Sequence, residues 1–219
     1  TDFGGERKKP EGAVIEILGP MDDPATDVTS IIRAYGIEQE FPKSVMKEAQ
    51  SVPQEILEHP GGKRVDFRNL LTVTIDGEDA RDLDDAITLS KKDEKYYLGV
   101  HIADVAHYVK EDSPLDKEAL ERATSVYLAD RVIPMLPREL SNGICSLNAG
   151  TDRLAMSCMM TFDVNGNVLD HTITESVICV DERMSYTGVK AILEGQEHPE
   201  GEREDIRALC FLMKEAAAI

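Results

Sequence analysis

Short runs rich in β-branched and aromatic residues begin near Val65 and predict a sheet. The runs are separated by acidic or lysine-rich turns and read LLTVTID, AITLS, YYLGVHIA, LAMSCMMTF and VLDHTITESVI. The last two runs flank Asn165-Gly166, the dipeptide most typical of a tight hairpin. A sheet is therefore expected from Val65 onwards.

Helical patterns lie before and after these runs. The segment TSIIRAYGI predicts a short helix closed by Gly36, and FPKSVMKEAQSV predicts another with Pro42 at its first position. Ser113 is a hydroxyl cap followed by Pro114, and it starts a helix that runs through LDKEALERATSVYL. The last residues, EDIRALCFLMKEAAAI, place apolar side chains on one helical stripe, and we expect this helix to be cut rather than finished.

The N-terminal region predicts an isolated strand. GAVIEILG (residues 12–19) reads as one strand, and MDDPATD follows it as a break with no strand nearby to pair with. A lone strand indicates a severed domain. We therefore expect an α+β fragment, with a mixed sheet, flanking helices and a truncated domain before them.

Composition indicates a soluble globular protein, with 42% hydrophobic and 30% charged residues among 219. No apolar run of membrane-spanning length and no secretory signal is present, so no membrane contact is expected. The four cysteines form no CxxC pair, which favours reduced thiols and a cytoplasmic location. The formal net charge of −18 argues against nucleic-acid binding by this piece alone.

The acidic segment between two predicted strands is the strongest chemical signal. Six acidic residues fall within the ten positions from Asp76 to Asp85. A solvated acidic loop would explain the charge alone. However, Asp76 ends one apolar run while Asp82, Asp84 and Asp85 abut the next, so the carboxylates sit where strands enter the core. Carboxylates with poor hydration favour cations, and hard oxygen ligands favour Mg²⁺ or Mn²⁺.

Two other metal-binding motifs share features with this acidic segment. A calcium loop requires a D-x-D-x-D-G series, a glutamate at its twelfth position and flanking helices, whereas the flanks here predict strands. The bare D-x-D of Asp82 and Asp84 also occurs in sugar-nucleotide transferases, so a metal-dependent transferase stays as an alternative.

Three motifs together resemble one enzyme family. The motifs are TIDGEDARDLDDAITL, GVHIADVAHYV and VIPMLPRELSNGICSLN, in this order along the chain. They resemble the catalytic (RNB) domain of the ribonuclease II / ribonuclease R family, and their residues are more similar to ribonuclease R than to ribonuclease II. GAVIEILG resembles the end of that family's second cold-shock domain. The resemblance implies an OB-type end at residues 1–20, a helical linker at 21–64, and the first part of the RNB domain at 65–219.

By this resemblance, four residues fall on the family's catalytic aspartates, which hold Mg²⁺ and the scissile phosphate: Asp76, Asp82, Asp84 and Asp85. Asp84 is the member expected to position the nucleophilic water. Tyr127 matches the aromatic that packs on the 3′-terminal nucleotide, and Tyr186 matches a tyrosine along the RNA path. Either tyrosine could instead be a core residue.

The implied activity is the processive, hydrolytic release of nucleoside 5′-monophosphates from the 3′ end of single-stranded RNA by a monomeric protein. The fragment lacks the family's later arginine and glutamates, so we expect it to be inactive by itself. A non-catalytic RNA-binding relative is the other alternative. His101 and His107 are interpreted as structural, Arg138 and Glu139 as a salt bridge ordering the site loop, and Glu78, Asp79 and Arg81 as loop surface.

Overall fold

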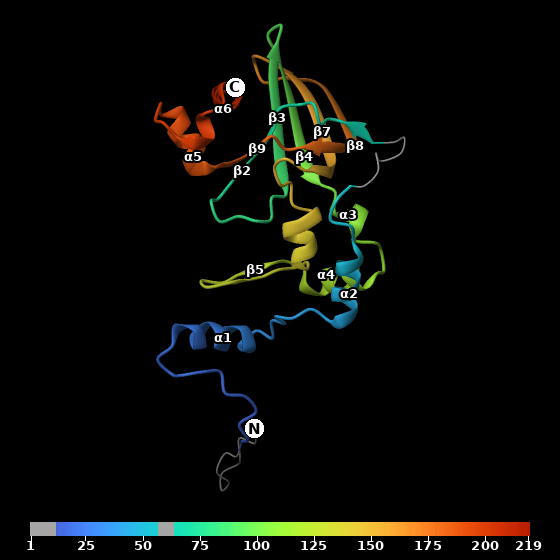
Figure 1. Ribbon diagram of the computed structural model, residues 1–219, viewed down its shortest axis with the longest axis vertical. Coiled ribbons are helices and arrows are strands. Elements are labelled where there is room, and N and C mark those ends of the chain that lie inside the picture. Colours follow the sequence, from blue (N-terminus) through green and yellow to red (C-terminus); the bar gives the residue numbers. More distant parts are fainter. Residues whose placement is uncertain (1–11, 57–63) are drawn as a thin grey trace.

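The computed structural model describes residues 12–56 and 64–219. A sheet with two helices at its side forms one end of an elongated molecule, and α1 lies near the other end, toward the N-terminus (Figure 1). The helical elements are α1 (Pro24–Ala34), α2 (Lys43–Ser51), α3 (Val105–Tyr108), α4 (Pro114–Arg122), the π-helical η1 (Glu139–Ile144), α5 (Tyr186–Leu193), the 3₁₀ turn η2 (Pro199–Gly201) and α6 (Glu204–Ala216).

The strands form one large mixed sheet and one small hairpin. They are β1 (Val65–Asp66), β2 (Thr72–Asp76), β3 (Asp85–Lys92), β4 (Lys95–Ala103), β5 (Val126–Tyr127), β6 (Val132–Ile133), β7 (Asp152–Asp163), β8 (Val168–Cys179) and β9 (Glu182–Ser185). The seven-stranded sheet has the order β1-β8-β7-β4-β3-β2-β9, and β5 pairs with β6. The central pairs are antiparallel, whereas β1 on β8 and β9 on β2 are parallel.

Turn chemistry sets the two long hairpins. Asp93 and Glu94 both have positive φ, at 50° and 60°, and form the two-residue turn between β3 and β4. Between β7 and β8, Gly166 has a φ of 80°, and Asp163 accepts hydrogen bonds from the backbone N–H groups of Asn165 and Asn167. The hairpin predicted at Asn165-Gly166 is thus confirmed.

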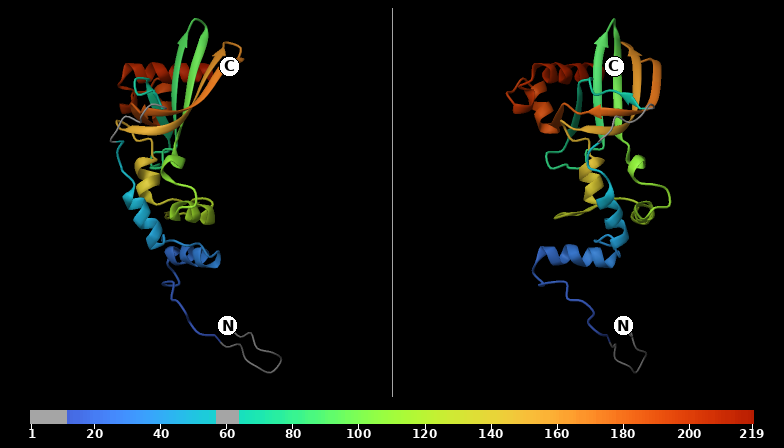
Figure 2. Two further views of the ribbon diagram at one scale, coloured as in Figure 1. Left: turned by 90° about the vertical axis from the view of Figure 1, so that its right-hand side faces the viewer. Right: turned by 45° about the vertical axis from the view of Figure 1, so that its right-hand side comes forward.

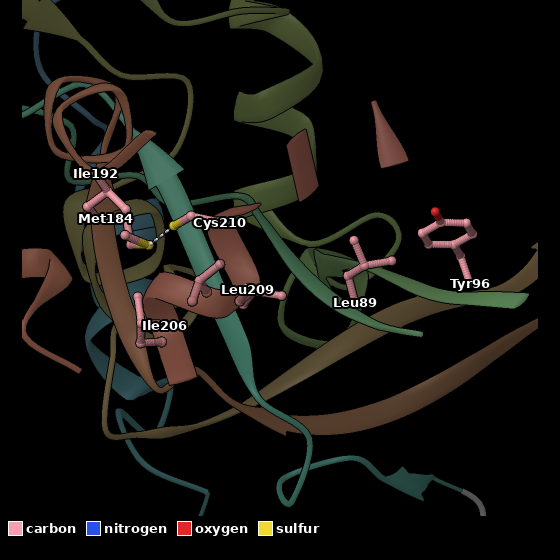
Figure 3. Packing of buried hydrophobic residues seen from close by; sticks show 8 residues of the cluster. Leu89, Tyr96, Met184, Ile192, Ile206, Leu209 and Cys210 are labelled. Carbon is pink, nitrogen blue, oxygen red and sulfur yellow. Dashed lines mark hydrogen bonds between the residues drawn. The ribbon is translucent and has the colours of Figure 1, made fainter. Parts of the chain in front are cut away.

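Helices α5 and α6 cover one face of the sheet at its β9–β2–β3 edge, as the two views of Figure 2 show. Their apolar side chains meet those of the strands in one buried cluster: Val73, Leu89, Tyr96, Met184, Ile192, Ile206, Leu209 and Cys210. Figure 3 shows the Cys210 thiol pointing to Met184, with a sulfur–sulfur distance of 3.9 Å. This packing fixes β9, the strand whose C-terminal end lies beside that of β2.

The opposite face carries a row of buried polar side chains. The Oγ atoms of Thr88 and Ser157 lie 3.0 Å and 2.6 Å from the two ring nitrogens of His101, which is fully buried. The row continues to Thr72 at one end and Ser176 at the other. His101 is therefore structural, as predicted. His107 is exposed and lies 3.3 Å from Arg64, away from the acidic loop.

The linker is fastened to the rest of the molecule by Arg122 at the end of α4. Its guanidinium forms an ion pair with Glu118, stacks on the Phe41 ring at 3.9 Å, and donates to the carbonyl oxygens of Glu38 and Glu40 at 3.0 Å and 2.8 Å. A third, longer bond of 3.4 Å reaches the carbonyl of Pro134, just after β6. The linker and the base of the β5–β6 hairpin are thereby held together.

The α+β class, the mixed sheet and the predicted helices are confirmed, with differences at the ends of two helices. Helix α1 begins at Pro24 because Asp23 caps it, so residues 24–27, the second half of the stretch predicted as a break, are helical. Helix α4 ends at Arg122 because Ala123 adopts the left-handed conformation, and Tyr127 belongs to a strand instead. Helix α5 was not predicted. Within the described residues, no helix is long and apolar enough to span a bilayer.

The strand predicted at GAVIEILG is wrong. Residues 12–19 have no strand assignment, and Val14, Ile15 and Ile17 are 84%, 97% and 85% exposed. A strand is held by hydrogen bonds to a neighbouring strand, and no described residue supplies one to this segment. Apolar alternation alone did not create a strand here.

Candidate active site

The acidic loop lies where β2 ends and β3 begins. Because β2 and β3 are antiparallel, Asp76 at the end of β2 and Asp85 at the start of β3 emerge at the same end of the sheet. Strand β9 is parallel to β2, so Ser185 lies beside Asp76 at that same end. The strand pairing thus brings Asp76 and Asp85 to the same end of the sheet, although they are nine positions apart in the sequence.

A buried leucine anchors the second half of the loop. Leu83 is fully buried, in a cluster with Ala86, Leu147 and Ile178. The backbone of the loop is bonded to residues just after η1: the Leu83 carbonyl accepts from the Leu147 N–H at 2.8 Å, and the Ser146 hydroxyl accepts from the Leu83 N–H at 3.1 Å. The side chains on either side of Leu83 therefore face away from the core.

The Ser146 hydroxyl also donates to the Arg81 carbonyl at 2.9 Å, and Arg153 donates to the Ser146 carbonyl at 2.8 Å. Arg153 is buried, and its other contacts are backbone carbonyls as well, those of Asp152 and Gly143. Burial lowers the pKa of this guanidinium. These bonds support the loop from the side of η1.

A cavity of about 670 Å³ opens over the loop. Three of the four predicted aspartates line it, with Tyr127 and polar residues from η1: Asp76, Asp79, Ala80, Arg81, Asp82, Asp84, Ser125, Tyr127, Val132, Pro134, Arg138, Ser141 and Asn142. Asp85 does not line the cavity, although its charge acts on Asp76 and Asp84. The structure therefore brings Asp76, Asp82, Asp84 and Tyr127 into one cavity, with Asp85 at its margin.

The carboxylates repel each other. Desolvation raises the pKa of Asp84, and the charges of Asp82, Asp85 and Asp76 raise it further. Desolvation and Asp85 likewise raise the pKa of Asp76, while Arg183 opposes the shift. Positive charge placed among these groups would relieve the repulsion, which is the behaviour expected of a cation site.

The donor chemistry fits a hard divalent cation, because the cavity offers carboxylate oxygens with Asn142, Ser125 and Ser141 nearby. The side chains are not drawn together, however. Across residues 12–56 and 64–219, no three His, Cys, Asp or Glu side chains are gathered closely enough to hold a metal ion. The aspartates are neighbours in one cavity rather than a preformed ligand cage.

The two predicted tyrosines are both largely exposed, so neither is a core residue. Tyr127 is 67% exposed on β5, and its hydroxyl donates to Asp82 Oδ2 at 2.9 Å, a contact that raises the tyrosine pKa. Tyr186 is 65% exposed as the first residue of α5, directly after Ser185. Tyr186 does not line the carboxylate cavity.

Several polar residues have roles that the sequence did not predict. Asp79 and Arg81 are exposed but line the cavity. Arg138 also lines the cavity, and the ion pairs of the described residues include none between Arg138 and Glu139. The predicted salt bridge between Arg138 and Glu139 is therefore wrong. Arg183, whose charge acts to lower the pKa of Asp76, was not identified from the sequence. Its position near Asp76 depends on the pairing of β9 with β2, which no local pattern predicts.

The chain is similar to known proteins. The RNB domain profile matches residues 64–218, and the cold shock domain profile matches residues 1–42. Ribonuclease R 1 of Lactococcus lactis is 51% identical over 188 residues, which cover 85% of this chain and 23% of that protein. Ribonuclease R of Thermotoga maritima is 50% identical over 190 residues, covering 85% of this chain and 27% of that protein.

Solved structures show the same fold. Mycoplasma genitalium RNase R in complex with ribose methylated single-stranded RNA superposes with a TM-score of 0.83 at 32% identity, covering 90% of this chain and 30% of that chain. The same RNase R in complex with double-stranded RNA gives 0.79 at 34% identity, covering 83% and 32%. The chain thus spans between 23% and 32% of the lengths of these three proteins.

Proposed function

The chain belongs to the RNB-domain family that includes ribonuclease R, and on this premise we propose that the full-length protein containing it is a hydrolytic, Mg²⁺-dependent 3′→5′ exoribonuclease. Its substrate is single-stranded RNA, and its products are nucleoside 5′-monophosphates. The observation that carries the proposal is the convergence of Asp76, Asp82 and Asp84 on one cavity, with Asp85 at its margin.

Four side chains are assigned to holding divalent cations: Asp76, Asp82, Asp84 and Asp85. Bound Mg²⁺, or Mn²⁺ in its place, supplies an activated water and charge neutralisation at the scissile phosphate. Because no three of these carboxylates meet around one point, ion binding has to draw them together from their present positions. Asp84, on which the charges of the other three aspartates act, is assigned to orienting the attacking water.

Tyr127 and Tyr186 are assigned to the RNA. An exposed aromatic ring beside a phosphate-processing site can stack on any base, which holds single strands without sequence preference. The Tyr127 ring lies at the cavity, where its hydroxyl donates a hydrogen bond to Asp82. We further propose that the protein acts as a monomer in the cytoplasm, and that residues 1–219 alone do not degrade RNA.

The activity is tested by incubating the full-length protein with 5′-labelled single-stranded RNA and Mg²⁺ and separating the products over time. We expect progressive shortening from the 3′ end, release of nucleoside 5′-monophosphates, and complete arrest by a chelator that Mg²⁺ or Mn²⁺ reverses. Retention of intact RNA on the protein would favour a non-catalytic RNA-binding relative. Consumption of a nucleotide-sugar instead of RNA would favour a transferase.

The role of the Tyr127 ring is tested by comparing two substitutions. Tyr127→Ala removes the stacking surface, and we expect the final undegraded oligonucleotide to change in length, since stacking contributes about 1–3 kcal/mol per base. Tyr127→Phe keeps the ring and loses only the bond to Asp82, so its end product should match that of the wild type. An unchanged product ladder for Tyr127→Ala would show that the ring does not hold the RNA.

A further inference from the structure

One arginine contacts the acidic loop without forming an ion pair with any carboxylate. Arg183 Nη2 donates to the carbonyl oxygens of Ala80 at 2.6 Å and Glu78 at 2.8 Å, with Gly77 more distant at 3.5 Å. The ion pairs of the described residues do not include Arg183, although acidic residues outnumber basic ones by 42 to 24 in this chain. Its contacts at the loop are to backbone only.

We propose that Arg183 is a positioning residue of the carboxylate site: it holds the turn at residues 77–80 by its carbonyl oxygens, so that Asp76 and Asp82 face one cavity and Arg183 itself occupies none of their carboxylate oxygens. The inference rests on the proposed function. Arg183 orders the loop, whereas the aspartates hold the cations.

Strand register places Arg183 at this position. In the parallel pair of β2 and β9, Arg183 lies beside Thr74 and Ser185 lies beside Asp76. Because side chains two residues apart share a face of the sheet, Arg183 and Asp76 project on the same side. The Met184 side chain, which lies between Arg183 and Ser185 along β9, points to the other face, where it is buried against α5 and α6, and this packing holds β9 in register.

The loop is therefore supported from two directions. Arg183 holds its first half by carbonyl oxygens, while Ser146, itself held by Arg153, binds the backbone of Arg81 and Leu83 in its second half. All of the Arg183 bonds come from Nη2, an atom held in the plane of a rigid guanidinium, whereas the ammonium of lysine is a compact charge on a flexible stem. A direct ion pair with Asp76 or Asp82 would instead occupy the oxygens that cations need.

Arg183 is exposed, so its replacement removes no core packing and the variant is expected to fold. We suggest Arg183→Met and Arg183→Lys in the full-length protein, with Arg207→Met as the matched control, because Arg207 is an exposed arginine on α6 with no side-chain hydrogen bond or ion pair among the described residues. Three quantities are measured: amide hydrogen exchange of residues 77–84, Mn²⁺ binding without RNA, and kcat and KM as functions of Mg²⁺ concentration.

For Arg183→Met we expect faster exchange in residues 77–84, metal affinity weaker by about 10-fold to 100-fold, and kcat lower by about 100-fold with KM for RNA nearly unchanged. Arg183→Lys should be intermediate and Arg207→Met like the wild type. Wild-type exchange and metal affinity in Arg183→Met would overturn the proposal, and so would a rise in KM alone, which would indicate direct RNA contact.

The outcomes separate this inference from the proposed function. If the wild-type protein degrades no RNA, the nuclease proposal fails whatever Arg183 does. If the wild type is active and Arg183→Met keeps its loop protection and metal affinity, only the role of Arg183 fails. Should Arg183→Met not fold, the comparison of Arg183→Lys with wild type decides by the same exchange and metal-binding criteria.

Discussion

Asp84→Asn in the full-length protein is expected to reduce RNA hydrolysis on the order of 10³-fold, about 4 kcal/mol of transition-state stabilisation, while single-stranded RNA binding stays nearly intact. The physical reason is that Asp84 is partly desolvated and repelled by the charges of Asp82, Asp85 and Asp76, so a cation among these carboxylates would stabilise its charged form. Asparagine keeps the shape of the side chain but loses its negative charge.

Glu78→Gln is the matched control for Asp84→Asn. Glu78 is an exposed acidic residue of the same loop that does not line the cavity, and its backbone carbonyl, which Arg183 binds, is unchanged by the substitution. We expect wild-type turnover from this variant. Nucleotide release by Asp84→Asn at the wild-type rate would refute the assignment, whereas equal losses in both variants would mean that loop charge in general, and not Asp84, is required.

Acidification from pH 7 to pH 5 is expected to destabilise the sheet by about 2 kcal/mol through His101 alone. Burial lowers the pKa of His101 from 6.5 to about 4. Between these values the unfolded chain binds a proton and the folded protein does not, so stability is complete above pH 6.5 and is lost as the pH falls toward 4. Protonation would also place a charge between the hydroxyl groups of Thr88 and Ser157.

Native-state hydrogen exchange of amides in β3 and β4, corrected for intrinsic rates, measures this opening free energy at both pH values. His101→Gln keeps a donor and an acceptor in the row but does not titrate. This variant should therefore lose about 2 kcal/mol less than the wild type over the same pH change. His171→Gln, at an exposed histidine of β8, should behave like the wild type. Equal losses in the wild type and His101→Gln would assign the acid sensitivity to other groups.

Local chemistry in the sequence was sufficient to predict most of the elements. The β-branched runs became β2, β3, β4, β7 and β8, because alternating apolar residues fit a sheet with buried faces. Asn165-Gly166 formed its hairpin and Ser113 capped α4, since these depend on backbone preferences within a few residues. The segment at residues 12–19 failed for the complementary reason: a strand also needs a partner, which local pattern cannot supply.

The candidate site divides in the same way. From the sequence alone, the position of the acidic residues at the ends of predicted strands pointed to the aspartates, and the resemblance to the ribonuclease family pointed to Tyr127. Only the tertiary structure showed that Asp85 stands at the margin, that Tyr127 bonds to Asp82, and that Arg183 and Ser146 hold the loop. These contacts join residues 45 to 106 positions apart. They arise from strand order and core packing, which no local pattern of residues expresses.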